Sequence, residues 1–106
     1  MSKYLIIGSY TADGAKGVLK EGGTARRKAA EQVIRSVGGT VDAFYLAFGS
    51  DDFYVLVDAP DHAAIAAASL TVGASGAART RTIVLITPEE ADAATKLSPE
   101  YRPPGA

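Results

Sequence analysis

Hydrophobic and polar positions alternate along the chain in two rhythms, one typical of strands and one typical of helices. A period of two, rich in β-branched and aromatic residues, predicts strands over residues 3–10, 40–48, 53–58 and 78–87. A wider spacing of apolar residues, with residues that start helices, predicts helices over residues 11–20, 24–37, 61–72 and 88–97. The two patterns interleave, which indicates an α+β domain.

The predicted helices begin at residues that suit a first turn. Thr11, Thr24 and Asp61 can each accept a hydrogen bond from a free backbone N–H, and Pro88 is followed by two glutamates. Gly22-Gly23 separates the first two helical stretches, and we expect a hinge there. The connection between residues 48 and 53 is short, so the second and third strands should form an antiparallel hairpin.

Alternation also assigns strand residues to faces. In the first strand one face is expected to carry Tyr4, Ile6, Gly8 and Tyr10. In the second strand one face should carry Val41, Ala43, Tyr45 and Ala47, and the other Asp42, Phe44, Leu46 and Phe48. In the fourth strand Arg79 and Arg81 should share a face with Ile83 and Leu85. The first and third strands are largely apolar on both faces.

The order βαββαβ predicts a ferredoxin-like fold, in which a four-stranded antiparallel sheet carries both main helices on one face. Residues 1–97 should form this single domain, and residues 98–106 a proline-rich tail. A strand with one solvent-exposed face normally has a polar residue at every second position, and the first and third strands lack this pattern. The second face of the sheet therefore needs a cover that the chain does not supply. We therefore expect a homodimer or larger homo-oligomer, packed sheet against sheet.

Composition and charge remove several classes of function. The 106 residues have a net charge of −1, which gives no basic field for nucleic acid. The chain has no apolar run of about 20 residues and no signal-peptide pattern, so no membrane contact and a cytoplasmic location are expected. With no cysteine, disulfides, thiol chemistry and thiolate zinc sites are excluded. The single histidine, His62, leaves no two-histidine metal motif.

The short motifs in the chain do not indicate a specific function. Residues 17–24 have the two-glycine spacing of a phosphate-binding loop, but Gly23 stands where the lysine should be. Asp51 and Asp52 are neighbours whose side chains should point to opposite faces, so they would chelate a metal poorly. His62 is expected on the surface of a first helical turn rather than as a catalytic base. No metal and no cofactor are predicted.

A ligand pocket is expected to be apolar with a few convergent polar groups. Polar groups on or beside the apolar strands are the candidates for it: Tyr10, Tyr45, Asp52, Arg79 and Arg81. The two arginines could bind an anion. Alternatively, an arginine and Asp52 could form a structural ion pair.

Short motifs are spread over nearly the whole chain: Tyr10-Thr11 with Gly14, Gly22-Gly23-Thr24, Arg26-Arg27, Gly38-Gly39, Phe48-Gly49 with Asp52, Pro60-Asp61, Gly76 with Arg79-Thr80, and Thr87-Pro88-Glu89-Glu90. Taken together, they resemble the GYD domain family of small bacterial proteins. It implies a ferredoxin-like fold of the dimeric α+β barrel type. The tyrosine of the family's naming motif is replaced here by Asp51.

The resemblance implies no specific activity, so three functions stay open. The first is binding of a small molecule, aromatic or anionic, including cofactor-independent catalysis of the monooxygenase or isomerase type found in related dimeric barrels. In that case Tyr10 or Tyr45 could transfer a proton and Arg79 or Arg81 could hold an anion. The second is a non-catalytic sensor or accessory subunit, and the third is a purely structural oligomer.

Overall fold

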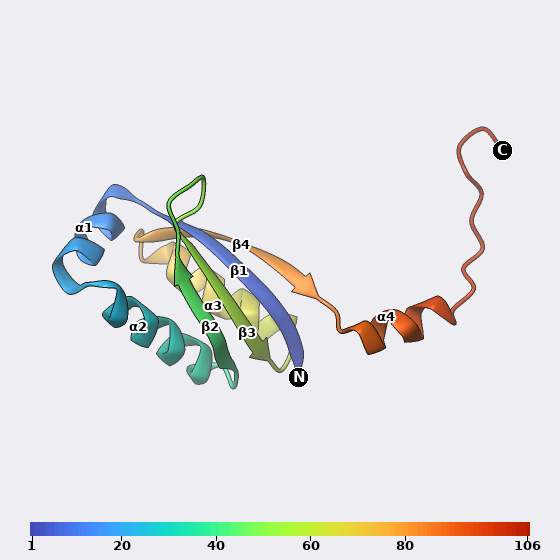
Figure 1. Ribbon diagram of the computed structural model, residues 1–106, viewed down its shortest axis with the longest axis horizontal. Helices are drawn as coiled ribbons and strands as arrows, with labels where there is room; N and C mark the ends of the chain where they lie inside the picture. Colours follow the sequence, from blue (N-terminus) through green and yellow to red (C-terminus); the bar gives the residue numbers. More distant parts are fainter.

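The computed structural model describes all 106 residues and contains one four-stranded antiparallel sheet and four helices (Figure 1). The strands lie in the spatial order β2-β3-β1-β4 and are β1 (Ser2–Tyr10), β2 (Thr40–Leu46), β3 (Phe53–Ala59) and β4 (Ala78–Leu85). The helices are α1 (Ala12–Glu21), α2 (Gly23–Ser36), α3 (His62–Ala74) and α4 (Pro88–Thr95). The α+β class and the β2–β3 hairpin are confirmed.

The hydrophobic core lies between one face of the sheet and the helices α2 and α3. In β3 every second residue is buried, from Phe53 through Val55 and Val57 to Ala59. These residues pack with Tyr4 and Ile6 of β1, with Ile34 of α2, and with Ile65 and Ala68 of α3. Both helices therefore cover the same face, which we call the helix-facing side, and the opposite face is called the outer face.

The register of β2 differs from the one that simple alternation predicts. Val41 pairs with Val57, but Ala43 pairs with Leu56, so Asp42 is an extra residue in a β-bulge. Because a bulge shifts the alternation by one residue, Val41 and Phe44 both lie on the helix-facing side. The prediction that Val41 shares a face with Ala43 and Tyr45 is wrong for this reason.

Two of the predicted helix starts are confirmed, and in both a side chain caps the first turn. Thr11 accepts a hydrogen bond from Gly14 N–H, and Asp61 accepts one from Ala64 N–H. The predicted cap at Thr24 is wrong, because α2 already begins at Gly23 and its N-cap is Gly22, which has φ 87° and makes no side-chain cap bond. Only glycine adopts that backbone conformation without strain, so Gly22 is the hinge between α1 and α2.

Two glycines allow segments to approach closely. A Cβ on Gly14 would lie 1.9 Å from the carbonyl oxygen of Ala77, so glycine lets α1 pack against the turn before β4. A Cβ on Gly8 would lie 2.0 Å from the ring of Phe53. The missing side chain on β1 is therefore what makes room for that ring on the helix-facing side.

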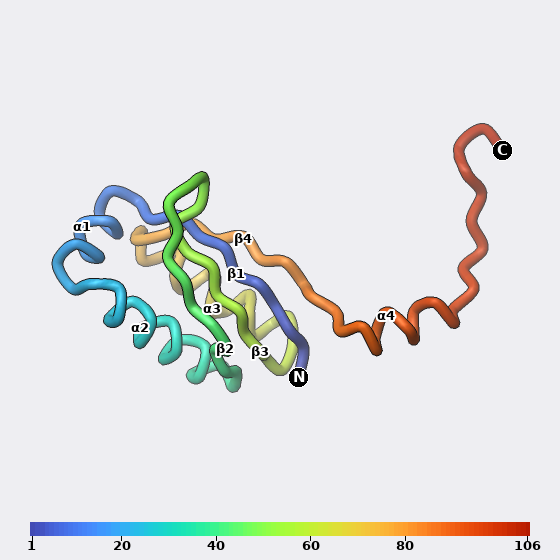
Figure 2. Tube along the Cα trace, in the orientation of Figure 1, coloured from blue at the N-terminus to red at the C-terminus, as the bar shows by residue number.

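The C-terminal segment stands away from the rest of the domain (Figure 2). Its helix α4 has a complete capping box between Thr87 and Glu90, with proline at the first turn, yet none of its residues is buried. The helix ends at Thr95 rather than at the predicted Leu97. The extended tail contributes to a longest dimension of 57 Å. None of the four helices is both long and apolar enough to cross a membrane.

Candidate functional site

A cavity of about 400 Å³ opens between the helix-facing side of the sheet and the helices α2 and α3. Its floor comes from β1, β2, β3 and β4, and its walls come from the inner faces of the two helices and the turn before β4. Most of the side chains are apolar, and the lining is Ile6, Tyr10, Arg26, Ala29, Ala30, Val33, Ile34, Phe44, Phe53, Val55, Ala68, Ser69, Val72, Ser75, Ala77, Ala78 and Thr80. Small residues on both helices keep this space open.

Aromatic rings form one side of the cavity. The ring centroids of Tyr10 and Phe53 are 5.1 Å apart, at an interplanar angle of 44°. Those of Phe44 and Phe53 are 6.2 Å apart and nearly parallel, at 10°. Offset ring pairs of this kind offer an extended π surface, so the wall suits a flat apolar or aromatic guest.

A few polar groups interrupt the apolar lining. Arg26 of α2 is the only charged residue among those that line the cavity. The hydroxyl of Ser69, on α3, is buried and makes no hydrogen bond. A buried hydroxyl without a partner costs free energy, so Ser69 is a donor and acceptor that a guest could satisfy.

The phenol of Tyr10 has a raised pKa, so it ionises less easily than an ordinary tyrosine. Burial is the main cause and raises its pKa, the nearby charge of Arg26 opposes this, and the charge of Asp52 adds to the rise. A raised pKa keeps the hydroxyl protonated at neutral pH. Tyr10 is therefore a hydrogen-bond donor in the cavity rather than a base.

Asp52 fixes the backbone beside Tyr10. Its carboxylate accepts a hydrogen bond from Tyr10 N–H at 2.8 Å, and its own N–H donates to the carbonyl of Gly8 at 2.8 Å. Its carbonyl accepts from Ala47 N–H at 2.8 Å. Asp52 thus ties together the end of β1, the segment after β2 and the start of β3, and its role is to position Tyr10.

Comparison with known proteins identifies the family. The model of the GYD domain matches residues 4–95, from the third residue of β1 to the end of α4. The chain belongs to the GYD domain family. No curated protein and no solved structure is significantly similar to it.

The structure divides the predicted site residues of this GYD domain between the two faces of the sheet. Tyr10 lines the cavity and Asp52 holds its backbone. Tyr45 pairs with Tyr54 on the outer face, and its side chain is 69% exposed. Arg79 and Arg81 pair with Ser9 and Ile7 of β1, also on the outer face. The two arginines and Tyr10 are therefore not brought together in one site.

The ion pair considered for Asp52 is made by its neighbour instead. Arg81 Nη2 lies 3.1 Å from the carboxylate of Asp51. The side chain of Asp51, the residue that the resemblance places at the family's naming tyrosine, contacts an outer-face arginine. It is absent from the cavity lining.

Sequence reasoning missed Arg26, Ser69 and Phe44 as cavity residues. Arg26, Ala29, Ala30 and Val33 share the spacing of one helix face, so the face of Arg26 could have been read from that pattern. Phe44 was hidden by the bulge at Asp42. Ser69 lies in an alanine-rich helix that gives no amphipathic signal.

The single histidine lies outside the cavity. His62 is the first residue of α3, is exposed, and forms a 2.7 Å hydrogen bond between Nδ1 and the hydroxyl of Tyr4. Tyr4 is itself 1% exposed, so its hydroxyl needs this partner. His62 lies on the surface of a first helical turn, as the sequence predicts, and it satisfies a core tyrosine. No group of three or more metal-ligating acidic or histidine side chains occurs in the GYD domain.

Proposed function

We propose that this GYD domain binds a small molecule with a flat apolar body and one anionic group in the cavity between the sheet and α2 and α3, and that it works as a homo-oligomer. The aromatic wall of Tyr10, Phe44 and Phe53 would hold the flat body. The guanidinium of Arg26 would pair with the anion, and the protonated hydroxyl of Tyr10 would donate to it.

The observation that carries this proposal is the open cavity itself. Protein interiors are filled to about the density of organic crystals, so a purely structural domain would close such a space with larger side chains. Here alanines of both helices and Ser69 of α3 line the space, and the volume of about 400 Å³ lies within the usual range for ligand sites. A lone arginine on an otherwise apolar lining is typical of a site that orients one charged group.

The architecture supports the homo-oligomeric part of the proposal. The sheet order β2-β3-β1-β4, with both main helices on one face, is the arrangement expected of a ferredoxin-like domain. Leu5 and Leu56 on the two central strands of the outer face are half-buried, Ile7 beside them is 3% exposed, and no helix lies over this face (Figure 1). These features support an assembly of the dimeric α+β barrel type, in which a second copy would cover the face.

One observation favours catalysis as a second candidate function. The hydroxyl of Tyr10 stays protonated, because burial raises its pKa, and it lines an apolar cavity that also holds Arg26. Such a donor could protonate a carbanion or enolate formed in the bound guest. Turnover that disappears in Tyr10→Phe, while the variant still binds the same molecule, would distinguish an enzyme from a sensor.

A matched pair of probes tests the binding proposal. Naphthalene-2-carboxylate and naphthalene-2-carboxamide have nearly the same shape and differ in charge. We expect the carboxylate to raise the unfolding temperature more than the amide does, because only the carboxylate can pair with Arg26. In Arg26→Gln this preference should vanish.

The neighbouring arginine provides the control. Arg27 is exposed on α2 and does not line the cavity, so Arg27→Gln should keep the preference for the carboxylate. Equal responses of the two arginine variants would contradict the assignment of the anion to Arg26. No response of the unmodified protein to either probe, by calorimetry as well as by thermal unfolding, would argue against a site of this chemistry.

A further inference from the structure

The cavity is open at one end of the sheet and closed at the other. At the open end Tyr10, the last residue of β1, is half-buried, and Ser75 is exposed. Four residues earlier in β1, Ile6 pairs with Val55, and both side chains are buried. The next helix-facing residue of β1 is Tyr4, which is buried in the core and does not line the cavity, so the cavity closes there.

Helix α2 runs from the open end to the closed end. The strands β1 and β2 end at the same edge of the sheet, because both pair antiparallel with β3. A Cβ on Gly23, the first residue of α2, would lie 3.0 Å from Leu46 at the end of β2. A Cβ on Gly39, just before β2 begins, would lie 2.9 Å from Ile34. Arg26 is therefore at the open end of the cavity and Ile34 at the closed end.

Helix α3 runs in the opposite direction. Its first residue, His62, bonds to the hydroxyl of Tyr4 beyond the closed end. The turn after the helix is held by Thr11, which follows β1 at the open end and donates to a carbonyl of this turn at 2.7 Å. Ser69 comes six residues before Ser75, which corresponds to about 9 Å along the helix axis. Ser69 therefore lies in the closed half of the cavity.

Arg26 is available to bind an anion at the open end. The ion pairs of the structure involve Lys3 and Arg81, so no carboxylate occupies the guanidinium of Arg26. Its positive charge opposes the rise in the pKa of Tyr10, so the two groups lie within electrostatic reach of each other. An anion between them would accept hydrogen bonds from both.

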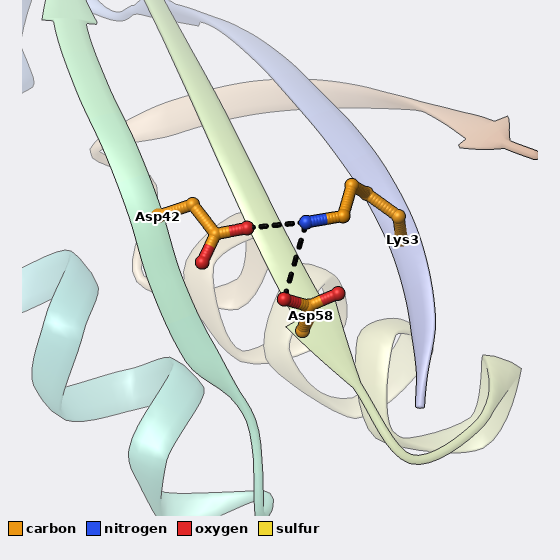
Figure 3. A network of polar contacts seen from close by, with 3 residues as sticks. All are labelled: Lys3, Asp42 and Asp58. Carbon is orange, nitrogen blue, oxygen red and sulfur yellow. Dashed lines mark hydrogen bonds and ion pairs between the residues drawn. The ribbon is translucent and has the colours of Figure 1, made fainter. Parts of the chain in front are cut away.

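No charged side chain lines the closed end of the cavity. The charged residues on the strands at that end are Lys3, Asp42 and Asp58, and they lie over the outer face. Lys3 Nζ is 2.6 Å from the Asp42 carboxylate and 3.2 Å from the Asp58 carboxylate, so the three side chains pair with one another (Figure 3). Arg26 is the only charged residue of the lining, and a guest would therefore meet its charge partner only at the open end.

The hydroxyl of Ser69 is a polar group at the closed end, and it lacks a partner. Its oxygen is buried, and no protein group bonds to it. The other serine of the lining, Ser75, donates to the Val72 carbonyl at 2.6 Å and accepts from Ala77 N–H at 3.2 Å. A serine within a helix usually bonds to the preceding turn or points to water, and Ser69 does neither. Because an unpaired buried hydroxyl costs free energy that alanine would not, a serine here points to a group on the guest.

We propose that the guest of this cavity is an elongated arene with a carboxylate at one end and a hydroxyl at the other. The carboxylate lies at the open end against Arg26 and Tyr10, and the hydroxyl bonds to Ser69, about 9 Å deeper. Rotation of Ser69 about its Cα–Cβ bond, from one staggered position to another, turns its own hydroxyl toward the guest. This inference rests on the proposed function, whose anion site it shares.

Three naphthalene carboxylates test where the second oxygen of the guest lies. The hydroxyl of 6-hydroxynaphthalene-2-carboxylate is at the end opposite the carboxylate, that of 3-hydroxynaphthalene-2-carboxylate is beside the carboxylate, and naphthalene-2-carboxylate has none. Calorimetry on the full chain measures the Kd of each. We expect the 6-hydroxy probe to bind about tenfold more tightly than the unsubstituted one, the effect of one hydrogen bond to a buried group that otherwise lacks a partner. The 3-hydroxy probe should gain less than about twofold, because its hydroxyl cannot reach Ser69.

A pair of variants on one helix checks the role of Ser69. In Ser69→Ala the advantage of the 6-hydroxy probe should fall below about twofold, and the unsubstituted carboxylate should bind as before. Thr71→Ala is the matched control, because Thr71 is exposed on α3, bonds to the Ala67 carbonyl at 2.8 Å and does not line the cavity. This control variant should keep the advantage in full.

The outcomes separate this inference from the proposed function. Equal affinities of the 6-hydroxy and unsubstituted probes, or an advantage that survives in Ser69→Ala, would overturn the assignment of the hydroxyl to Ser69. In either case, a preference for the carboxylate over the amide that depends on Arg26 would leave the proposed function standing. If none of the three carboxylates binds, the proposed function and this inference both fail.

Nuclear Overhauser contacts give the direction of the guest without any variant. Ala68 and Ala78 both line the cavity and are both buried, and Ala78 pairs with Tyr10 at the open end. With the alanine methyl groups labelled, protons of the hydroxyl-bearing ring should contact Ala68, and protons of the carboxylate-bearing ring should contact Ala78. The reverse pattern would place the carboxylate at the closed end and overturn the proposal.

Discussion

The carboxylate of Asp52 accepts a hydrogen bond from the backbone N–H of Tyr10 at 2.8 Å, and this contact joins the last residue of β1 to the loop that enters β3. At Tyr10 the chain leaves the sheet, and the side chain turns into the cavity. The Asp52 carboxylate takes the place of a neighbouring strand as the acceptor for this N–H. It therefore fixes both the end of β1 and the position of the Tyr10 phenol. The contact therefore links stability of the sheet to the shape of the candidate site.

Replacing Asp52 should separate the loss of a hydrogen-bond acceptor from the loss of charge. In Asp52→Ala the Tyr10 N–H loses its partner, and we expect the free energy of unfolding to fall by about 1–2 kcal/mol. Asp52→Asn keeps an oxygen acceptor and should lose less than half of that. Chemical denaturation of the three proteins measures both values. Equal losses in the two variants would show that the negative charge, rather than the bond, matters.

Two glycines in one helix should respond to alanine in opposite directions. A Cβ on Gly14 would meet the backbone carbonyl of Ala77 at 1.9 Å, so Gly14→Ala should lower the free energy of unfolding by about 1–3 kcal/mol. Gly17 lies in the same helix with nothing within 4 Å of the added carbon. Gly17→Ala should therefore raise stability by about 0.5–1 kcal/mol. Thermal unfolding gives the sign of each change, and a stabilised Gly14→Ala would contradict this packing of α1.

Local signals in the sequence predicted much of this fold. The four strands and the starts of α1 and α3 follow from alternation and from Thr11 and Asp61, each of which acts on N–H groups only a few residues away. The hinge between α1 and α2 follows from Gly22, which needs no tertiary contact to adopt its backbone conformation. These elements depend on neighbours in sequence, so they can be inferred without the fold.

The candidate site was harder to predict, because it depends on contacts between distant segments. Alternation places Arg79 and Tyr10 correctly within their own strands, but only the register between β1 and β4 shows that they lie on opposite faces. The bulge at Asp42 turns Phe44 inward, and an extra residue in a strand leaves no mark in composition. Arg26 resembles the surface arginines beside it, and the cavity distinguishes it only once α2 is packed on the sheet.

The C-terminal segment should be dispensable for the fold of the domain. α4 has no buried residue, and Leu97 and Tyr101 beyond it are 71% and 77% exposed. A chain that ends at Thr87 should therefore keep its free energy of unfolding to within about 0.5 kcal/mol. Denaturation of the two chains at equal concentration measures the difference. A loss of several kcal/mol would show that the segment packs on a surface of the assembled protein.

Alkaline pH should weaken the fold through Tyr10. Because burial raises the pKa of its phenol in the folded state, the unfolded chain releases this proton first as the pH rises. The folded state then binds more protons than the unfolded state, so stability is full below the ordinary tyrosine pKa of about 10 and falls above it. Tyr10→Phe removes this contribution. The other tyrosines and the lysines titrate in both proteins, so the difference between the two isolates Tyr10. Denaturation from pH 8 to pH 11 should show that the free energy of unfolding falls less steeply in Tyr10→Phe than in the unmodified protein. Parallel curves would mean that this phenol ionises as easily in the folded protein as in the unfolded chain.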